Sequence, residues 1–241
     1  MLQDTGNLVL NTSQGKTSAR SFAWESFNEF PTFILLLTQK FSGNDSLQSR
    51  STNATYGSGN YYSLSIDAQS KITLYYNEQE GQAQKSFWQS NGEYPAITLD
   101  KYGFLNTSSV GEDSLIMASD GGQEDRLRRL TLQSNGGLRM YSRKRDSPSS
   151  SWQMVWEAVT GYCTIYGSCG ENAVCKVDQN WEPNCQCPPG FDPGSSDNKT
   201  CRRIDEIKGT DVRFVELDYV NFDGLNVTEA TVTKLQAAKI H

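Results

Sequence analysis

The chain has 241 residues, 36% of them hydrophobic and 21% charged, and its formal net charge is −6. A negative charge of this size argues against a general nucleic-acid binder, and the longest apolar run, at residues 33–37, is too short to cross a bilayer. Abundant Gly, Ser, Thr and Asn favour an all-β extracellular protein. Strand-like sequence starts directly at Met1 without a signal peptide, so we expect a fragment or truncated product of a longer secreted protein.

Residues 2–10 (LQDTGNLVL) begin the chain with apolar and polar residues alternating around a turn. The same pattern recurs in three later segments whose starts are 33 residues apart. Alternation with period two around a short turn predicts a hairpin with one buried face. The paired strands are expected at 64–67 with 72–75, at 97–100 with 104–105, and at 130–133 with 138–141.

Three such hairpin units amount to about a hundred residues, the size of one ordinary domain. A closed arrangement lets each sheet bury its apolar face against the other two, so the sequence predicts pseudo-threefold packing. Gly103 and Gly136 suit two of the turns, whereas 69–71 (QSK) is a weaker turn. The copy at residues 2–10 lies too far upstream for this set and is interpreted as the last hairpin of a preceding domain.

Basic residues gather around the third hairpin, interleaved with a few acidic ones. They could face an acidic partner or an anionic glycan; we favour a solvated outer face, because the carboxylates dilute the positive charge. The basic residues are Arg126, Arg128, Arg129, Arg139, Arg143, Lys144 and Arg145, and the acidic ones Glu124, Asp125 and Asp146. Four tryptophans are expected in the core rather than in a ligand groove, where their burial stabilises most: Trp24, Trp88, Trp152 and Trp156.

All six cysteines lie between Cys163 and Cys201, with the spacing C-x5-C-x5-C-x9-C-x-C-x13-C. Six cysteines permit fifteen pairings, so counting does not give the connectivity. A segment this short depends on covalent links to fold, and disulfides persist only where the surroundings oxidise. A zinc site is the alternative, but C-x2-C spacing is absent and the only histidine is the terminal His241. The cysteines therefore indicate disulfides and an extracellular location.

Catalytic machinery is not expected. One terminal histidine cannot complete a Ser-His-Asp or Cys-His arrangement, kinase motifs are missing, and no acidic run precedes Cys163 to bind calcium. We therefore predict no catalytic residue, no cofactor and no metal site. A helix is expected at 228–238. Six Asn-x-Ser/Thr glycosylation sequons support an extracellular chain, at Asn11, Asn44, Asn53, Asn106, Asn198 and Asn226.

Seven segments follow one another in a characteristic order. They are LQDTGNLVL at 2–10, WESFNEFPTFILLLTQ at 24–39, YYSLSIDAQSKITLYY at 61–76, RLTLQSNGGLRMYS at 129–142, SWQMVWEA at 151–158, CTIYGSCGENAVC at 163–175 and CQCPPGF at 185–191. In this order the chain resembles the ectodomain of plant receptor-like kinases of the G-type lectin (S-domain) class.

The resemblance implies bulb-type lectin domains of the β-prism II fold, an EGF-like (epidermal-growth-factor-like) module and a PAN-type domain, followed in such receptors by a membrane helix and a kinase. The domains implied here are a first-lectin remnant at 1–42, a second β-prism at 43–160, the EGF-like module at 161–203, and a linker with an incomplete PAN-type region at 204–241. An EGF-like module would pair Cys163 with Cys175, Cys169 with Cys185, and Cys187 with Cys201.

Mannose-binding members of the family carry the motif Q-x-D-x-N-x-V-x-Y on a hairpin, and every copy here is eroded. The copy at 133–141 keeps Gln133 and Tyr141 but has Asn135 in place of the aspartate. Losing that carboxylate removes a charge-assisted hydrogen bond of about 1.5–3 kcal/mol. We therefore interpret Gln133, Asn135 and Tyr141 as a vestigial carbohydrate site that now shapes the hairpin.

The resemblance implies a non-catalytic recognition segment of a receptor-like kinase, at the extracellular side of the plasma membrane or secreted, with a role such as pollen self-recognition or pathogen sensing. Its expected partners are a protein, peptide or glycan ligand and a second receptor as homo- or heterodimer. Nucleic acid is not expected, and membrane contact only through the helix of the parent receptor. The alternative is a soluble mannose-type lectin, and a third hypothesis is a glycosidase, although nothing in the sequence singles out a pair of carboxylates among the 28 acidic residues.

Overall fold

The computed structural model describes residues 8–11, 22–26, 33–37, 39–49, 61–77, 84–107, 116–147, 149–177, 183–194 and 200–204. The chain divides into two compact units, residues 1–159 and 160–241. Strands dominate both units, and the one helical element among the described elements is a short 3-10 turn. The predicted all-β class is confirmed.

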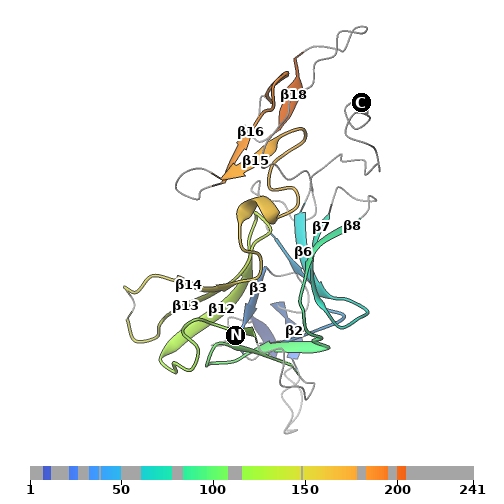
Figure 1. Ribbon diagram of the computed structural model, residues 1–241. Helices are drawn as coiled ribbons and strands as arrows, with labels where there is room; N and C mark the ends of the chain where they lie inside the picture. The colour runs from blue at the N-terminus through green and yellow to red at the C-terminus, as the bar shows by residue number, and fades with distance from the viewer. Residues whose placement is uncertain are drawn as a thin grey trace. The chain divides into compact units, whose positions relative to one another are not determined.

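Three four-stranded antiparallel sheets form most of the first unit (Figure 1). One sheet has the order β5 (Leu47–Gln48), β6 (Tyr61–Ile66), β7 (Ile72–Asn77) and β8 (Gln84–Gln89). The next has β4 (Lys40–Ser42), β9 (Ala96–Leu99), β10 (Phe104–Thr107) and β11 (Ile116–Met117). The last has β3 (Ile34–Leu36), β12 (Arg126–Leu132), β13 (Leu138–Lys144) and β14 (Gln153–Glu157).

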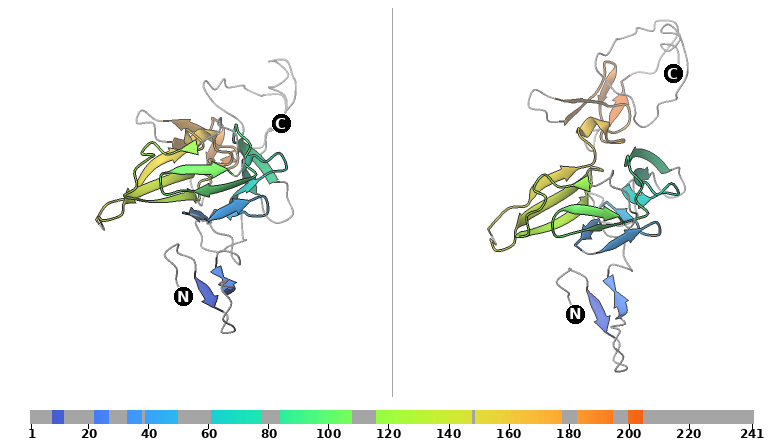
Figure 2. Two further views of the ribbon diagram at one scale, coloured as in Figure 1. Left: turned by 90° about the horizontal axis from the view of Figure 1, so that it is seen from below. Right: turned by 60° about the horizontal axis from the view of Figure 1, so that its bottom comes forward.

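The three predicted hairpins are the centres of these sheets: β6–β7, β9–β10 and β12–β13. Each sheet turns its apolar residues toward a common interior, and Figure 2 shows the sheets around it from two further sides. Burying one face of each sheet against the others is what makes the alternating sequence stable as strands. The largest fully buried side chains include Leu64 and Leu74, Leu99 and Leu105, and Leu130, Leu132 and Met140. The β-prism expectation is confirmed.

Strands from before residue 43 take part in these sheets. Leu35 of β3 pairs with Leu130 of β12, and Phe41 of β4 pairs with Ile97 of β9. The domain boundary between residues 42 and 43 stays a prediction. Strands β3 and β4, which precede it, are hydrogen bonded to strands β12 and β9, which follow it. Further upstream, β1 (Val9–Asn11) and β2 (Phe22–Glu25) form a separate two-stranded sheet.

The three hairpin turns have the same backbone geometry. Ser70, Gly103 and Gly136 occupy equivalent positions, with φ angles of 59°, 89° and 83°. Glycine adopts this left-handed region without steric cost, whereas serine does not. The turn that the sequence predicted to be weakest therefore forms with the same shape, held by the hydrogen bonds described below.

A buried arginine holds the third sheet against the loop that precedes it. Arg128 is 2% exposed and points inward, as Leu130 and Leu132 do on the same strand. Its guanidinium donates to the Asp120 carboxylate, to the Asp120 carbonyl (3.0 Å) and to the Lys101 carbonyl (3.2 Å). Burial alone would raise the pKa of Asp120, but hydrogen bonds from Ser142 (2.6 Å) and Arg128, with nearby positive charge, lower it overall.

Three disulfides hold the second unit together: Cys163–Cys175, Cys169–Cys185 and Cys187–Cys201. These are the pairs that the EGF-like resemblance implies. The unit begins with the 3-10 turn η1 (Tyr162–Thr164) and continues with two antiparallel pairs. The pairs are β15 (Val174–Val177) with β16 (Pro183–Gln186), and β17 (Phe191–Pro193) with β18 (Cys201–Arg203).

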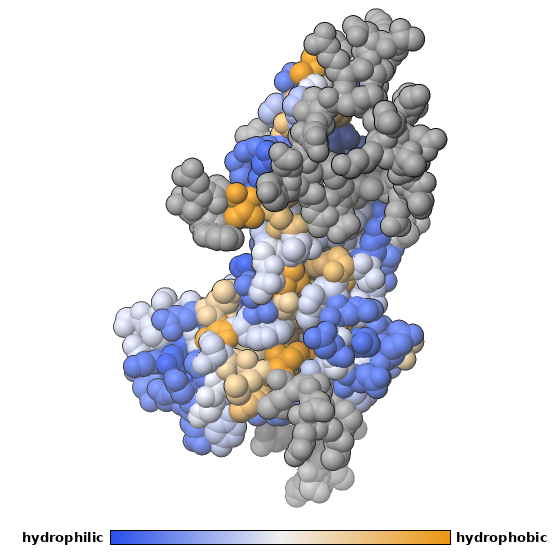
Figure 3. Space-filling view, in the orientation of Figure 1, coloured by the Kyte–Doolittle hydropathy of each residue, from blue (hydrophilic) through white to orange (hydrophobic). Residues whose placement is uncertain are grey.

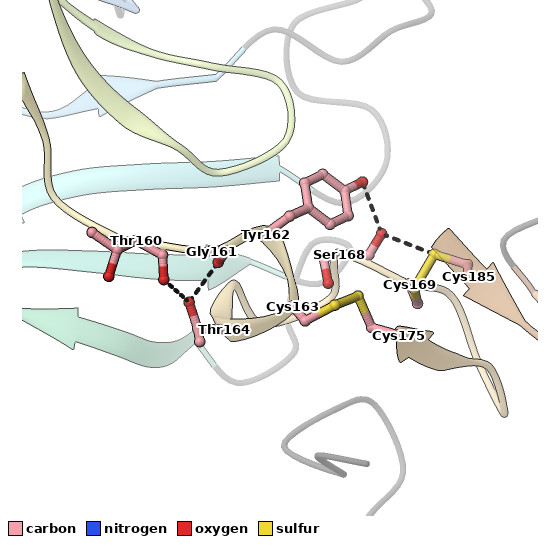
Figure 4. Close-up of a disulfide and its surroundings, with 9 residues drawn as sticks. All are labelled: Thr160, Gly161, Tyr162, Cys163, Thr164, Ser168, Cys169, Cys175 and Cys185. Atoms are coloured by element: carbon pink, nitrogen blue, oxygen red, sulfur yellow. Dashed lines mark hydrogen bonds between the residues drawn. A yellow bond between two sulfur atoms is a disulfide. The ribbon is translucent and has the colours of Figure 1, made fainter. Parts of the chain in front are cut away.

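Polar contacts support the disulfides of this unit. The Tyr162 hydroxyl donates to the Ser168 carbonyl at 3.2 Å, next to the half-cystine Cys169 (Figure 4). Asn172 donates through Nδ2 to the Cys201 carbonyl at 3.2 Å, and Cys201 N–H donates to the Glu171 carbonyl at 2.8 Å. One side-chain and one backbone hydrogen bond therefore link β18 to the first half of the disulfide-bonded part of the unit. The predicted helix at 228–238 and nearly all of the PAN-type region lie outside the described residues.

Candidate recognition surface

The hairpin tips are closed by side chains at equivalent positions in all three sheets. In the first, Asp67 Oδ1 accepts from the N–H groups of Gln69 and Lys71, and its Oδ2 accepts from Thr73 Oγ1, all at 2.9 Å. Together these bonds lower the pKa of Asp67 against the opposing effect of burial. The residue before each turn thus bonds to the side chain six residues later, across the hairpin.

The second tip repeats this arrangement with different residues. Asp100 Oδ1 accepts from the N–H groups of Tyr102 and Phe104 at 2.9 Å. Its Oδ2 accepts from Asn106 Nδ2 at 2.8 Å. Asp100 and Asn106, which lie at sugar-motif positions of this hairpin, are thus hydrogen bonded to each other and close the turn.

The third tip contains the three residues predicted as a vestigial carbohydrate site. Gln133 Oε1 accepts from Arg139 Nη1 at 2.9 Å, and Gln133 Nε2 donates to the Tyr141 hydroxyl at 2.5 Å. Asn135 Oδ1 accepts from the N–H of Gly137 at 3.1 Å. The structure brings Gln133 and Tyr141 together. Their polar atoms, and the side-chain oxygen of Asn135, form hydrogen bonds within the chain.

Side chains of opposite parity to the core form the outer face of β12 and β13. Arg129 lies directly across from Tyr141, and Thr131 across from Arg139. Trp152, which precedes β14, joins this group: the Arg129 guanidinium carbon is 4.3 Å from the centre of its ring, and that of Arg143 is 5.2 Å away. We call Arg129, Thr131, Arg139, Tyr141, Arg143 and Trp152 the arginine face.

The structure sorts the basic stretch into paired and unpaired charges. Arg128 binds Asp120, Arg126 lies 3.7 Å from Asp125, and Arg139 Nε lies 3.3 Å from a Glu157 carboxylate oxygen. By contrast, Arg129 and Arg143 form no ion pair or hydrogen bond with any residue that the structure describes. The acidic residues nearby therefore do not neutralise Arg129 and Arg143. The sequence had predicted that they would dilute the positive charge of the whole stretch.

Two residues of this region were placed wrongly from sequence. Trp152 was expected in the core, but it is half-buried and lies against arginines on the outer face. Arg128 was grouped with the solvated basic residues, but it is buried. Alternation along the strand could have separated Arg128 from Arg129. Arg128 lies two residues before the core residue Leu130, so both side chains lie on the same face of the strand.

The sequons are distributed over different environments. Asn44 is exposed, in the turn that Asp45 closes through bonds to Ser42 of 2.8 Å. Asn106 is half-buried and bonded to Asp100. Asn11 ends β1, and the remaining sequons, Asn53, Asn198 and Asn226, lie outside the described residues. Occupancy of all six stays a prediction.

Within the described part of the chain, no three His, Cys, Asp or Glu side chains gather in a way that could hold a metal ion. None of the helices described there has the length and apolar character to span a membrane.

Residues 93–195 match the model of the S-locus glycoprotein domain. The chain is 30% identical to the G-type lectin S-receptor-like serine/threonine-protein kinase SD3-1 of Arabidopsis thaliana, over 78% of this chain and 24% of the relative. Its identity to the similarly named At1g34300 of the same plant is 25%, over 91% of this chain and 25% of the relative. The chain thus spans about a quarter of the length of these curated relatives.

Proposed function

Because this chain belongs to the G-type lectin S-receptor-like family, we propose that it is the ligand-recognition segment of a receptor-like kinase at the outer side of the plasma membrane. It would carry no catalytic activity itself. Its ligand would be a protein, peptide or glycan, and its binding would bring receptor chains together at the cell surface, as in pollen self-recognition or pathogen sensing.

The observation that carries this proposal is the extent of the family match. The S-locus glycoprotein match runs from residue 93 to 195, so it includes strands of the three-sheet unit and the part of the second unit that contains five of its six cysteines. A rigid sheet scaffold and a disulfide-linked module are suited to presenting a fixed surface outside the cell.

The soluble mannose lectin is the alternative, and the third hairpin tip argues against it. A sugar hydroxyl would have to displace the bonds that Gln133 forms with Arg139 and Tyr141. A shallow sugar site gains little from exchanging one hydrogen bond for another. We therefore expect no measurable affinity for mannose at this tip.

Sequencing of the full-length transcript tests the receptor proposal. We expect an apolar stretch of about twenty residues downstream, followed by the V-A-I-K, H-R-D and D-F-G motifs of a kinase. A stop codon directly after residue 241 in every transcript would contradict the proposal.

Calorimetric titration of the secreted chain with mannose tests the alternative. Saturable binding that is lost in Tyr141→Ala, but kept in the matched variant Tyr75→Ala at the equivalent position of the first hairpin, would establish the lectin.

A further inference from the structure

We propose that the arginine face binds an acidic oligosaccharide whose sugars are uronic acids, with Arg129 and Arg143 receiving the carboxylates. This inference deepens the proposed function, because it names a ligand class for the recognition segment. Its test measures binding by the chain itself, so its failure would leave the receptor assignment standing.

The first argument is the charge left over on this face. Arg139 has the Glu157 carboxylate beside it, 3.3 Å away, whereas Arg129 and Arg143 have no acidic partner among the described residues. Burial, and the nearby positive charge of Arg143, lower the pKa of Arg129, with Tyr141 opposing the shift. Two like charges held close together are relieved by an anion that binds both.

The second argument is that these guanidinium groups are already positioned. Arg129 lies over both Trp152 (4.3 Å) and Tyr141 (5.6 Å), and Arg143 lies over Trp152 (5.2 Å). In each, the only buried nitrogen without a partner is Nε, so the unpaired terminal Nη groups are accessible to solvent. A guanidinium supported on an aromatic ring loses less side-chain freedom when it binds a carboxylate. In Figure 3 the part of the molecule formed by β12 to β14 shows hydrophilic residues toward its outer end and a mixture of polar and apolar residues elsewhere.

The third argument favours a sugar chain over an acidic peptide. β12 is hydrogen bonded to β3 and β13, and β13 to β12 and β14, so neither strand offers a free edge to which a peptide could add. The face presents only side chains. Among them, Met154, paired with Tyr141, is 49% exposed, whereas Thr131 is buried.

These side chains match the chemistry of a uronic acid. A carboxylate takes two parallel hydrogen bonds from an arginine. The apolar face of the sugar ring can lie against the exposed Met154 side chain. Neutral sugars would leave the two arginines without an anion, so they should bind much more weakly.

Oligomers of galacturonic acid are the probe, and the same oligomers with methyl-esterified carboxyl groups are the matched neutral control. Calorimetry of the full secreted chain should show saturable binding of the acid form that weakens as salt is added. The ester should bind about tenfold more weakly or worse, because its charge-assisted hydrogen bonds are lost.

Variants on the paired strands β12 and β13 separate a specific site from general attraction. Arg143→Gln and Arg129→Gln should each lower the affinity about tenfold or more. Lys144→Gln removes the same charge from the next residue, which has the opposite parity and pairs with Arg126, and should leave the affinity unchanged. Unchanged thermal unfolding would show that each variant is folded.

Equal affinity for the acid and the ester would overturn the proposal. So would a loss in Lys144→Gln as large as that in Arg143→Gln, because binding would then be nonspecific attraction. Tighter binding of an acidic peptide such as oligoglutamate would assign the face to a protein partner and also refute the sugar assignment.

Discussion

Replacing Asp120 by alanine should destabilise the three-sheet unit more than any surface charge change. Arg128 is buried with its guanidinium bonded to the Asp120 carboxylate, and Ser142 bonds the other carboxylate oxygen at 2.6 Å. Without that carboxylate a positive charge stays in the interior, bonded to backbone carbonyls only. Removing one partner of a buried pair costs about 3–5 kcal/mol.

The lower end of that range applies here. The carbonyls of Lys101, at 3.2 Å, and Gln123, at 3.3 Å, still accept hydrogen bonds from Arg128 after the substitution. We therefore expect a loss of about 3 kcal/mol in the free energy of unfolding. For a unit of this size this corresponds to a fall of roughly 6–12 °C in Tm.

Urea and thermal unfolding followed by tryptophan fluorescence measure this loss, because four of the five tryptophans lie in residues 1–159. The control is Asp125→Ala, since the Asp125 side chain is 59% exposed and its ion pair with Arg126 is weak. Arg128→Met combined with Asp120→Ala should recover much of the loss, because no unpaired charge remains buried. Equal destabilisation by Asp120→Ala and Asp125→Ala would refute the reasoning.

Four further predictions follow from the same structure. The pKa of Asp120 is lowered in the folded chain. The stability that Asp120 contributes should therefore be complete above the ordinary aspartate pKa of about 3.9 and lost as the pH falls through the pKa of the folded chain. Unfolding measured over this pH range should show the difference in stability between wild type and Asp120→Ala shrinking in acid. Mild reduction, or Cys169→Ser with Cys185→Ser, should unfold the second unit and leave the tryptophan-detected transition of the first in place. Ser70→Gly should raise the stability by about 0.5–1 kcal/mol in urea unfolding, because it relieves a left-handed serine. Asn44→Gln should remove one glycan by mass spectrometry, since Asn44 is exposed in a turn; an unchanged mass would show that Asn44 is unoccupied.

The hairpins could be predicted from sequence because their signal is local. Alternation and turn residues at a fixed interval identified β6–β7, β9–β10 and β12–β13 directly. The partners of β3 and β4 could not be predicted in this way, because Leu35 pairs with Leu130, nearly a hundred residues later, and nothing in a short strand specifies a distant neighbour.

The candidate site was predicted less completely than the fold. Composition showed a basic stretch, and the family motif pointed to Gln133 and Tyr141, but neither indicates which arginine has an acid beside it. That depends on loops such as the one with Asp120, whose position is set by tertiary packing. The parity of Arg128 was the one local clue, and it identifies a buried arginine only once the inward phase of the strand is known.

Each hairpin tip is closed by its own side-chain hydrogen bond: Asp67 with Thr73, Asp100 with Asn106, and Gln133 with Arg139. Because these three hydrogen bonds share no residue, substitutions at one hairpin tip should leave the bonds at the other two unchanged. Such an arrangement would allow the sequence of one hairpin to vary without first requiring a more stable protein.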